Sequence, residues 1–401
     1  MTPSTAHLTL PFFDAVHREL APRLVDWMAT QSVDERDDRQ ACREWVKKLG
    51  ANGWLRYCVP SGPDGALGGA LPRLDSRALV VLRETLAFYS PLADFSLAMQ
   101  GLGSGVITLA GTPAQQAAYL PHVASGEKIA AFALSEADAG SDVGAMETIA
   151  ISARIRGANG LFDAYILNGS KTWISNGGIA DFYVTFAKTD PQAGTRGISA
   201  FIVDADTPGL DASEHIAVMA PHPLATLRFR QCSVPATARL GTLHGGFKLA
   251  MQTLDIFRAS VAGAALGMAR RALAEAIQHA KRRKLFGQTL ADFQLTQARI
   301  GEMAALVDAA ALLTYRAAWL RDEGERLGTP ARVTQEAAMA KMVATENAQR
   351  VIDMALQLHG ALGVKVGTKV EALYRDIRAL RIYEGATEVQ QLIIGKALLK
   401  S

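Results

Sequence analysis

Residues 164–175 read Ala164-Tyr165-Ile166-Leu167-Asn168-Gly169-Ser170-Lys171-Thr172-Trp173-Ile174-Ser175, and this stretch decides the fold class. Two runs rich in apolar, aromatic and β-branched residues flank the dipeptide Asn168-Gly169. Asn-Gly accepts the positive φ angles of a tight hairpin turn, so the pattern predicts a strand, a turn and a second strand. The middle of the chain is therefore expected to be a β domain.

Further strand-like segments surround this stretch. Three short apolar runs and one alternating apolar–basic run are the predicted strands: Ile129–Leu134, Phe182–Ala187, Ile198–Val203 and Leu227–Arg230. Alternation of apolar and polar residues is typical of a strand with one exposed face. Residues 129–243 are therefore predicted to form an antiparallel β-sandwich or barrel.

Helical periodicity dominates on both sides of the β domain. Residues 1–128 carry apolar positions at helical spacing, as in 78–86, and predict an all-α domain. Residues 244–401 contain four long stretches with this period, at roughly 246–283, 291–326, 331–359 and 368–398. Four long helices with short links indicate an up-and-down bundle. The predicted fold class is α+β, with an N-terminal helical domain, a β domain and a C-terminal four-helix bundle.

Composition narrows the function classes. The 401 residues carry a formal net charge of +3, which gives no reason to expect a nucleic-acid partner. The three cysteines lie far apart without metal-ligand spacing, so we expect a reducing compartment and no metal. Neither a long apolar run nor a targeting pattern is present, so we expect a cytoplasmic protein without a membrane span. The glycines of residues 101–105 are misplaced for a nicotinamide-binding loop, and no P-loop or nucleophile elbow occurs.

Three short segments could bind a cofactor, and each also has an ordinary structural interpretation. Residues 134–142 form a loop of small and hydroxyl residues that could approach an anion, or an ordinary turn. Trp173 and Ser175 could cover and hydrogen-bond a flat ring, although a core tryptophan at a strand end gives the same pattern. Arg283 could hold a phosphate, or it could belong to a solvated basic helix face.

A fourth segment, Tyr383-Glu384-Gly385, could supply a general base. A carboxylate between an aromatic residue and a glycine can be removed from water, which raises its pKa toward the range of a useful base. The same acid could instead stabilise a helix N-terminus through the helix dipole. The segment by itself leaves both interpretations open.

In this order, the four segments resemble the acyl-CoA dehydrogenase family of FAD enzymes over about residues 12–400. Two signatures carry the resemblance: Ser135-Glu136-x-x-Ala139-Gly140-Ser141-Asp142 and Tyr383-Glu384-Gly385-x-Thr387-Glu388. Arg283-x-x-Phe286-Gly287 and Gln357-x-x-Gly360 lie between them. The resemblance implies dehydrogenation of an acyl-CoA thioester to the trans-2-enoyl-CoA, in which Glu384 removes the α proton and flavin N5 takes the β hydride.

The resemblance also implies which residues bind the cofactor and the substrate. The FAD-binding positions would be Phe132, Leu134, Ser135, Gly140, Ser141, Trp173, Ser175, Arg283, Phe286, Gln294, Gln357, Gly360, Gly385, Thr387 and Glu388. The substrate-side positions would be Ser141, Asp255, Arg258, Tyr383 and Glu384. In the family, part of the FAD contact comes from a neighbouring subunit. The thioester oxygen is bound by the N–H of the base residue and by a ribityl hydroxyl of FAD.

Family members place the catalytic base at one of two sequence positions. One is the C-terminal Tyr-Glu-Gly segment, and the other directly precedes an arginine of the first bundle helix. That arginine is Arg258 here, and it is preceded by Phe257, which cannot accept a proton. The resemblance is therefore to the medium- and short-chain type, with Glu384 as the base.

The resemblance implies an acyl-CoA substrate, an electron-transfer flavoprotein as electron acceptor, a homotetramer and a role in fatty acid metabolism. A flavin enzyme of the same fold that acts on a carrier-protein-bound acyl group, or as a monooxygenase or oxidase, is the main alternative. Oxygenase relatives typically lack a carboxylate at the position of Glu384. A non-catalytic helical interaction module is a further alternative, which the sparse charge does not favour.

Overall fold

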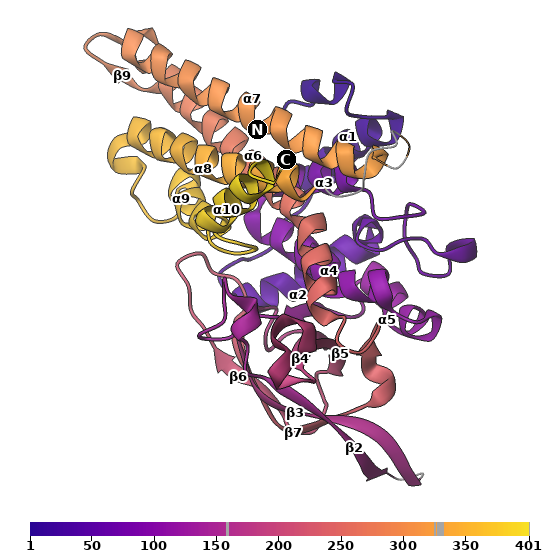
Figure 1. Ribbon diagram of the computed structural model, residues 1–401. Coiled ribbons are helices and arrows are strands. Elements are labelled where there is room, and N and C mark those ends of the chain that lie inside the picture. The colour runs from indigo at the N-terminus through magenta and orange to yellow at the C-terminus, as the bar shows by residue number, and fades with distance from the viewer. Residues whose placement is uncertain (158–159, 325, 327–332, 401) are drawn as a thin grey trace. The chain divides into compact units, whose positions relative to one another are not determined.

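The chain is helical at both ends and β-rich in the middle, so the predicted fold class is confirmed (Figure 1). The computed structural model describes residues 1–157, 160–324, 326 and 333–400. Residues 325, 331 and 332 of two predicted helices lie outside the described residues. The chain divides into two compact units: Met1–Ser32, Asp75–Asp94 and Asp255–Ser401 in the first, Val33–Leu74 and Phe95–Leu254 in the second.

Five helices precede the first strand. They are α1 (Ala15–Ala29), α2 (Asp38–Ala51), α3 (Ser76–Tyr89), α4 (Pro91–Ala110) and α5 (Pro113–Ser125). Helix α3 is buried on nearly every side, including its charged side chains Arg77, Arg83 and Glu84. Charged residues are almost never fully buried unless they are paired, and these three find ionic partners on other segments, such as Asp322 for Arg77, Asp94 for Arg83 and Arg270 for Glu84.

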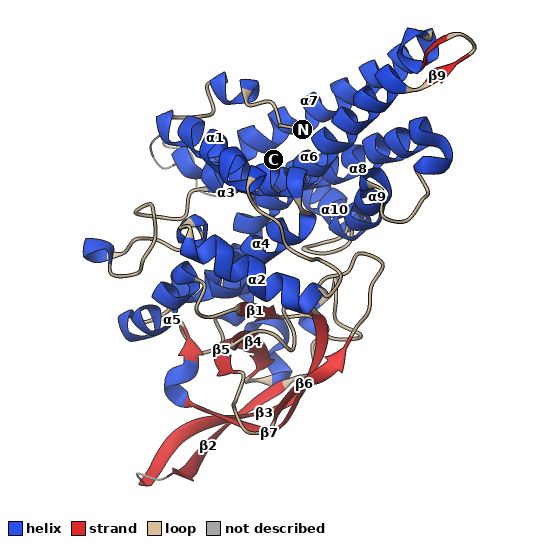
Figure 2. Ribbon diagram, turned by 180° about the vertical axis from the view of Figure 1, so that it is seen from behind, coloured by secondary structure: helices blue, strands red, loops and turns tan. Residues whose placement is uncertain are grey.

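The strands of the second unit form one mixed sheet (Figure 2). The strands are β1 (Ala130–Ala133), β2 (Ile149–Gly157), β3 (Gly160–Ser175), β4 (Phe182–Lys188), β5 (Ile198–Asp204), β6 (Leu210–His215), β7 (Leu224–Pro235) and β8 (Arg239–Leu240). Their order is β6-β7-β3-β2-β4-β5-β8, with β1 paired to β4. Most pairs are antiparallel, as predicted, but β4 pairs in parallel with β1 and β2.

The predicted hairpin at Asn168-Gly169 is wrong, because residues 160–175 form the single strand β3. Strand β3 has ladder partners on both sides, β2 and β7, which hold it extended through the dipeptide. The dipeptide forms an irregularity in the pairing with β7, and Gly169 has a φ of 141°. A Cβ on Gly169 would lie 2.7 Å from the Cα of Thr148, so the glycine permits close approach of backbones.

The C-terminal region differs from the predicted four helices in one place. The structure has α6 (Gly246–Arg282), a two-stranded hairpin of β9 (Lys284–Leu285) and β10 (Gln288–Thr289), α7 (Gln294–Glu323), α8 (Thr334–His359), α9 (Lys369–Leu380) and α10 (Thr387–Leu398). The predicted helix 368–398 is therefore two helices. The interruption contains Glu384 with a φ of 53° and Gly385 with a φ of 94°, and consecutive left-handed residues end a right-handed helix.

Within the described part of the chain, two helices, α4 and α7, are long and apolar enough to cross a membrane by length and composition. In α4, 83% of the most apolar window is buried within the protein, compared with 44% in α7. The core helix of a globular protein meets the same criterion, and α4 has the burial of such a helix.

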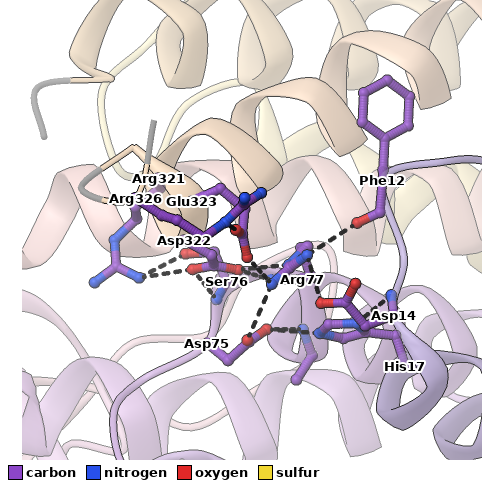
Figure 3. A network of polar contacts seen from close by, with 11 residues as sticks. Phe12, Asp14, His17, Asp75, Ser76, Arg77, Arg321, Asp322, Glu323 and Arg326 are labelled. Carbon is purple, nitrogen blue, oxygen red and sulfur yellow. Dashed lines mark hydrogen bonds and ion pairs between the residues drawn. The ribbon is translucent and has the colours of Figure 1, made fainter. Parts of the chain in front are cut away.

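The start of α3 is fixed by carboxylates from two other segments (Figure 3). Asp75 caps the helix by accepting the N–H of Ala78 at 2.8 Å. Asp322 of α7 accepts the N–H groups of Ser76 and Arg77 at 2.8 and 2.9 Å. These carboxylates satisfy N–H groups that the helix itself leaves unbonded, and they complement the positive end of its dipole.

The Arg77 guanidinium connects the same carboxylates to the N-terminal segment. It lies 3.2 Å from Asp322, 2.8 Å from Glu323 and 3.0 Å from Asp14, the residue before α1. His17 of α1 reaches Asp75 at 3.0 Å. One charge network, buried except at Asp14, therefore ties α1, α3 and α7 together within the first unit (Figure 3).

Replacement of Asp322 by asparagine is expected to lower the free energy of unfolding by about 2 kcal/mol, because hydrogen bonds to a buried charged acceptor are lost. Urea denaturation measures the change. Glu302→Gln is a matched control on α7, because Glu302 pairs with Arg350 at the surface and exposed pairs contribute little. Equal stability of the two variants would contradict the capping role of Asp322.

Candidate active site

The segment Tyr383-Glu384-Gly385 lies between α9 and α10, and its carbonyl groups are held by side chains from three helices. Arg258 Nε of α6 donates to the Glu384 carbonyl at 3.3 Å. Lys341 Nζ of α8 and Gln390 Nε2 of α10 donate to the Gly385 carbonyl at 2.8 and 2.9 Å. Gly385 has a φ of 94°, and a Cβ there would lie 2.4 Å from Gln390 Nε2, so another residue would strain this turn and displace the Gln390 side chain.

The Glu384 carboxyl group has the environment of a general base. The residue as a whole is half-buried, but its Oε2 atom is enclosed and has no hydrogen-bond partner among the described residues. Burial raises the pKa of this carboxyl, and nearby cations, Arg83 first, oppose the rise. The backbone N–H of Glu384 also makes no hydrogen bond within the described part of the chain. One residue therefore offers both a desolvated proton acceptor and a free N–H donor.

A buried ion pair that we did not predict from the sequence faces Glu384. Arg83 Nε and Nη2 donate to Asp94 Oδ1 and Oδ2 at 2.8 and 2.9 Å, and Arg83 Nη1 donates to Ser260 Oγ at 3.0 Å. Arg83 lowers the pKa of Glu384, whereas Asp94 raises it. The sequence signal was two charged residues, Arg83 and Glu84, inside an otherwise apolar helical run.

The substrate-side positions Asp255, Arg258 and Tyr383 all lie near Glu384 in the first unit. Arg258 Nη1 contacts Asp255 Oδ1 at 2.5 Å, and Asp255 Oδ2 accepts a hydrogen bond from Thr334 at 2.8 Å. Burial holds the pKa of the Tyr383 hydroxyl far above its usual value. Arg258 is itself 5% exposed, so the structure shows it holding the base segment from inside the bundle.

A second group of predicted residues lies in the β unit, where two segments meet. The N–H of Thr172 donates to the Ser135 carbonyl at 3.0 Å, so the end of β1 lies beside the end of β3. Trp173 is 58% exposed and has a φ of 60°, at an irregularity in the pairing with β7. The hydroxyls of Ser135 and Ser175 make no hydrogen bond within the described residues. An exposed indole and two free hydroxyls fit the face and edge of a flat heteroaromatic ring.

A buried ion pair that the sequence interpretation missed fixes these two segments. Lys171 Nζ donates to Glu136 Oε1 at 2.7 Å and to the Leu134 carbonyl at 3.1 Å. Glu136 also accepts the N–H groups of Glu147 and Thr148 at 2.6 and 3.0 Å. Burial lowers the pKa of Lys171 to about 8. Phe132 and Leu134 are therefore held in place by a satisfied network, while Gly140 and Ser141 lie in the exposed loop that follows.

The remaining predicted cofactor residues lie in the bundle. Thr387 Oγ1 donates to Glu346 Oε1 at 2.6 Å at the start of α10, and Glu388 is exposed in the same turn. Arg283, Phe286, Gln294, Gln357 and Gly360 are all exposed. Phe286, with a φ of 50°, and Gly287, with a φ of 81°, form the two-residue turn between β9 and β10. Figure 1 shows this hairpin at the outer ends of α6 and α7, so the structure does not bring Arg283 and Phe286 to Glu384.

Comparison with known proteins gives matches along the whole chain. Three family models match: the acyl-CoA dehydrogenase N-terminal domain at residues 13–127, the middle domain at 131–232 and the C-terminal domain at 244–399. A 3-(aryl)acrylate reductase of Clostridium sporogenes is 39% identical, over 97% of this chain and 100% of that protein. A caffeyl-CoA reductase–Etf complex subunit of Acetobacterium woodii is 38% identical, over 93% of this chain and 94% of that protein.

A solved structure shares the fold and bears on the cofactor. It is an acyl-CoA dehydrogenase of Bacillus anthracis complexed with FAD, 30% identical, with a TM-score of 0.85 over 97% of this chain and 67% of that chain. The desolvated carboxylate of Glu384 and the exposed indole of Trp173 lie in segments that the C-terminal and middle domain models match. The chain therefore belongs to the acyl-CoA dehydrogenase family of FAD-dependent oxidoreductases.

Proposed function

We propose that the protein removes the α and β hydrogens of an acyl-CoA thioester to give the trans-2-enoyl-CoA. The observation that carries the proposal is Glu384, whose enclosed Oε2 has no partner and whose N–H is free among the described residues. The carboxylate accepts the α proton. The N–H donates to the thioester oxygen, which stabilises the charge that develops there; loss of one such donor typically costs about 10²–10³ in rate.

The residues of the β unit fit the FAD that the family uses. In the proposal Phe132, Leu134, Ser135, Trp173 and Ser175 border the flavin ring, and Gly140 and Ser141 lie in the loop beside it. When bound, FAD supplies the two-electron acceptor to which the β hydrogen is lost. The protein contributes a fixed surface, because the Glu136–Lys171 pair holds both bordering segments.

We further propose a homotetramer in which a second subunit receives the β9–β10 hairpin. Phe286 at its tip is 90% exposed, and a large apolar side chain in that position is expected to be covered by a partner. In the proposal the exposed bundle positions hold the phosphate and adenine part of FAD, partly across the subunit interface: Arg283, Phe286, Gln294, Gln357 and Gly360. Gly385, Thr387 and Glu388 would approach FAD beside the base.

We propose domain limits at 128/129 and 243/244. We also propose an electron-transfer flavoprotein as the electron acceptor and a role in fatty acid metabolism. One relative, a subunit of a reductase–Etf complex, supports the acceptor. The three cysteines, all among the described residues, are buried and form no disulfide, which supports a reducing compartment such as the cytoplasm.

Reduction of a 2-enoyl thioester is a second candidate function, because three relatives are named reductases. The same residues serve both directions. In reduction the protonated Glu384 carboxyl would deliver its proton to the α carbon, and burial favours that protonated form.

Anaerobic mixing of the flavin-loaded protein with a panel of acyl-CoAs tests the proposal. We expect loss of the visible flavin absorbance and formation of a 2-enoyl-CoA with at least one member, whether a short straight chain or a 3-arylpropanoyl chain. A panel that leaves the flavin oxidised, together with rapid consumption of oxygen by the reduced protein, would favour an oxidase or monooxygenase instead.

A further inference from the structure

Lys341 of α8 is a wholly buried lysine for which the proposed reaction has no use. Its Nζ donates to the Gly385 carbonyl at 2.8 Å, and this is the one hydrogen bond that the ammonium makes within the described residues. An ammonium group carries three N–H donors, and its burial is costly unless it is paired and hydrogen-bonded. A buried cation that is so poorly satisfied suggests a functional constraint rather than a contribution to stability.

Lys341 differs from the other cations near the Glu384 carboxyl in that it has no ion-pair partner among the described residues. The groups that face Glu384 from the packed helices are Arg83 of α3, Asp94 of α4, Arg258 of α6 and Lys341 of α8. Arg83 is neutralised by its bidentate pair with Asp94, and Arg258 by Asp255. Lys341 makes no ion pair within the described part of the chain. Glu384, Glu346 and Glu388 act on its positive charge only from beyond ion-pair distance, so no close partner neutralises it.

We propose that Lys341 is a positioning residue for the base: it holds the Gly385 carbonyl, and its charge, which has no close ion-pair partner among the described residues, favours the carboxylate form of Glu384. The inference rests on the proposed function. Together with Arg258 and Gln390, Lys341 occupies the carbonyl groups of residues 384 and 385, which leaves the N–H of Glu384 for the substrate.

The charge of Lys341 is itself sensitive to its surroundings. Burial lowers the pKa of Lys341 to about 8, and Glu384, Arg258, Glu346 and Glu388 also act on it, Glu384 most strongly. The ammonium is therefore charged below about pH 8.

Lys341→Met tests the proposal, because it removes the donor and the charge while it keeps an unbranched apolar side chain. In a plot of kcat/KM against pH, the acid limb is the part at low pH where kcat/KM falls as Glu384 takes up a proton. We expect this limb to move to higher pH by about one unit, so that kcat/KM at a given pH on the limb falls about tenfold. Lys341→Arg, which keeps the charge, is expected to retain the wild-type limb. Arg350→Met is the matched control, because Arg350 is an exposed cation on the same helix and pairs with Glu302.

A merely structural role gives a different result. Replacement of a buried charge by an apolar side chain is often neutral or stabilising, so Lys341→Met is expected to fold. If Lys341 only fills space, the thermal midpoint changes and the acid limb stays in place.

A substrate-free measurement separates this inference from the proposed function. Infrared titration of the Glu384 carboxyl, with Glu384→Gln as the subtraction reference, is expected to show the same upward shift in Lys341→Met. If no acyl-CoA reacts but the titration shifts, the proposed function fails and the role of Lys341 stands. If neither the titration nor the acid limb moves, the inference is overturned.

Discussion

Replacement of Glu384 by glutamine is expected to lower kcat for acyl-CoA dehydrogenation by about 1,000-fold or more, because a general base contributes factors of up to about 10⁴. Glutamine keeps the size of the side chain and the backbone N–H but cannot accept the α proton. Stopped-flow measurement of anaerobic flavin bleaching gives the rate. The visible spectrum of the purified variant shows whether FAD is retained.

Glu19→Gln is the matched control for this substitution, because Glu19 is an exposed acid on α1. We expect it to bleach like the wild-type protein. A Glu384→Gln variant that keeps its FAD and bleaches at the wild-type rate would remove Glu384 from the mechanism.

The pH dependence of the wild-type protein follows from the raised pKa of Glu384. Only the carboxylate form accepts a proton, so the dehydrogenation rate falls as the pH falls through this pKa. For enoyl reduction the sign reverses, because the protonated form is then the reactant and the rate falls as the pH rises. Whether the rate falls at low pH or at high pH in each assay therefore shows whether Glu384 accepts a proton, as in dehydrogenation, or donates one, as in reduction.

The sequence predicted the order of helices, sheet and helices because periodicity records which face of an element is buried. Strands β4 and β5 show this clearly, since they are short, apolar and buried on both faces. The hairpin at Asn168-Gly169 failed because a local turn signal competes with ladder partners that the sequence does not reveal. With β2 and β7 on its two sides, the dipeptide forms an irregularity within β3 instead of a turn.

In the candidate site, too, features set by neighbours along the chain could be predicted, whereas features set by residues far away in the sequence could not. Glu384 and Trp173 lie in short motifs that leave two interpretations open when read alone, and the order of these motifs along the chain, through its resemblance to the family, made both residues candidates. Lys341 and Arg83 were missed, because their roles come from residues far away in the sequence: Lys341 reaches the carbonyl 44 residues further along the chain. A buried charge within an apolar helix is the signal that could have identified both.

Replacement of Arg83 by methionine is expected to lower the free energy of unfolding by about 3–5 kcal/mol, because Asp94 would be left buried without its partner. Chemical denaturation measures the loss. The substitution also removes a cation that lowers the pKa of Glu384, so the acid limb of the rate profile is expected to move upward. Unchanged stability would show that Asp94 takes up a proton or finds another partner.

The double variant Arg83→Met, Asp94→Leu separates the contribution of this pair to stability from its effect on the pKa of Glu384. Apolar side chains of similar size can replace a buried ion pair with little loss of stability, so the double variant is expected to recover most of what the single variant loses. Arg83 and Asp94 shift the pKa of Glu384 in opposite directions, so the acid limb is also expected to return toward its wild-type position. If the acid limb returns but the stability does not, the pair stabilises the packing of α3 against residues 91–94 independently of its charge. Recovery of both would mean that the pair acts on Glu384 as a neutral unit, which leaves Lys341 as the cation that adjusts the base.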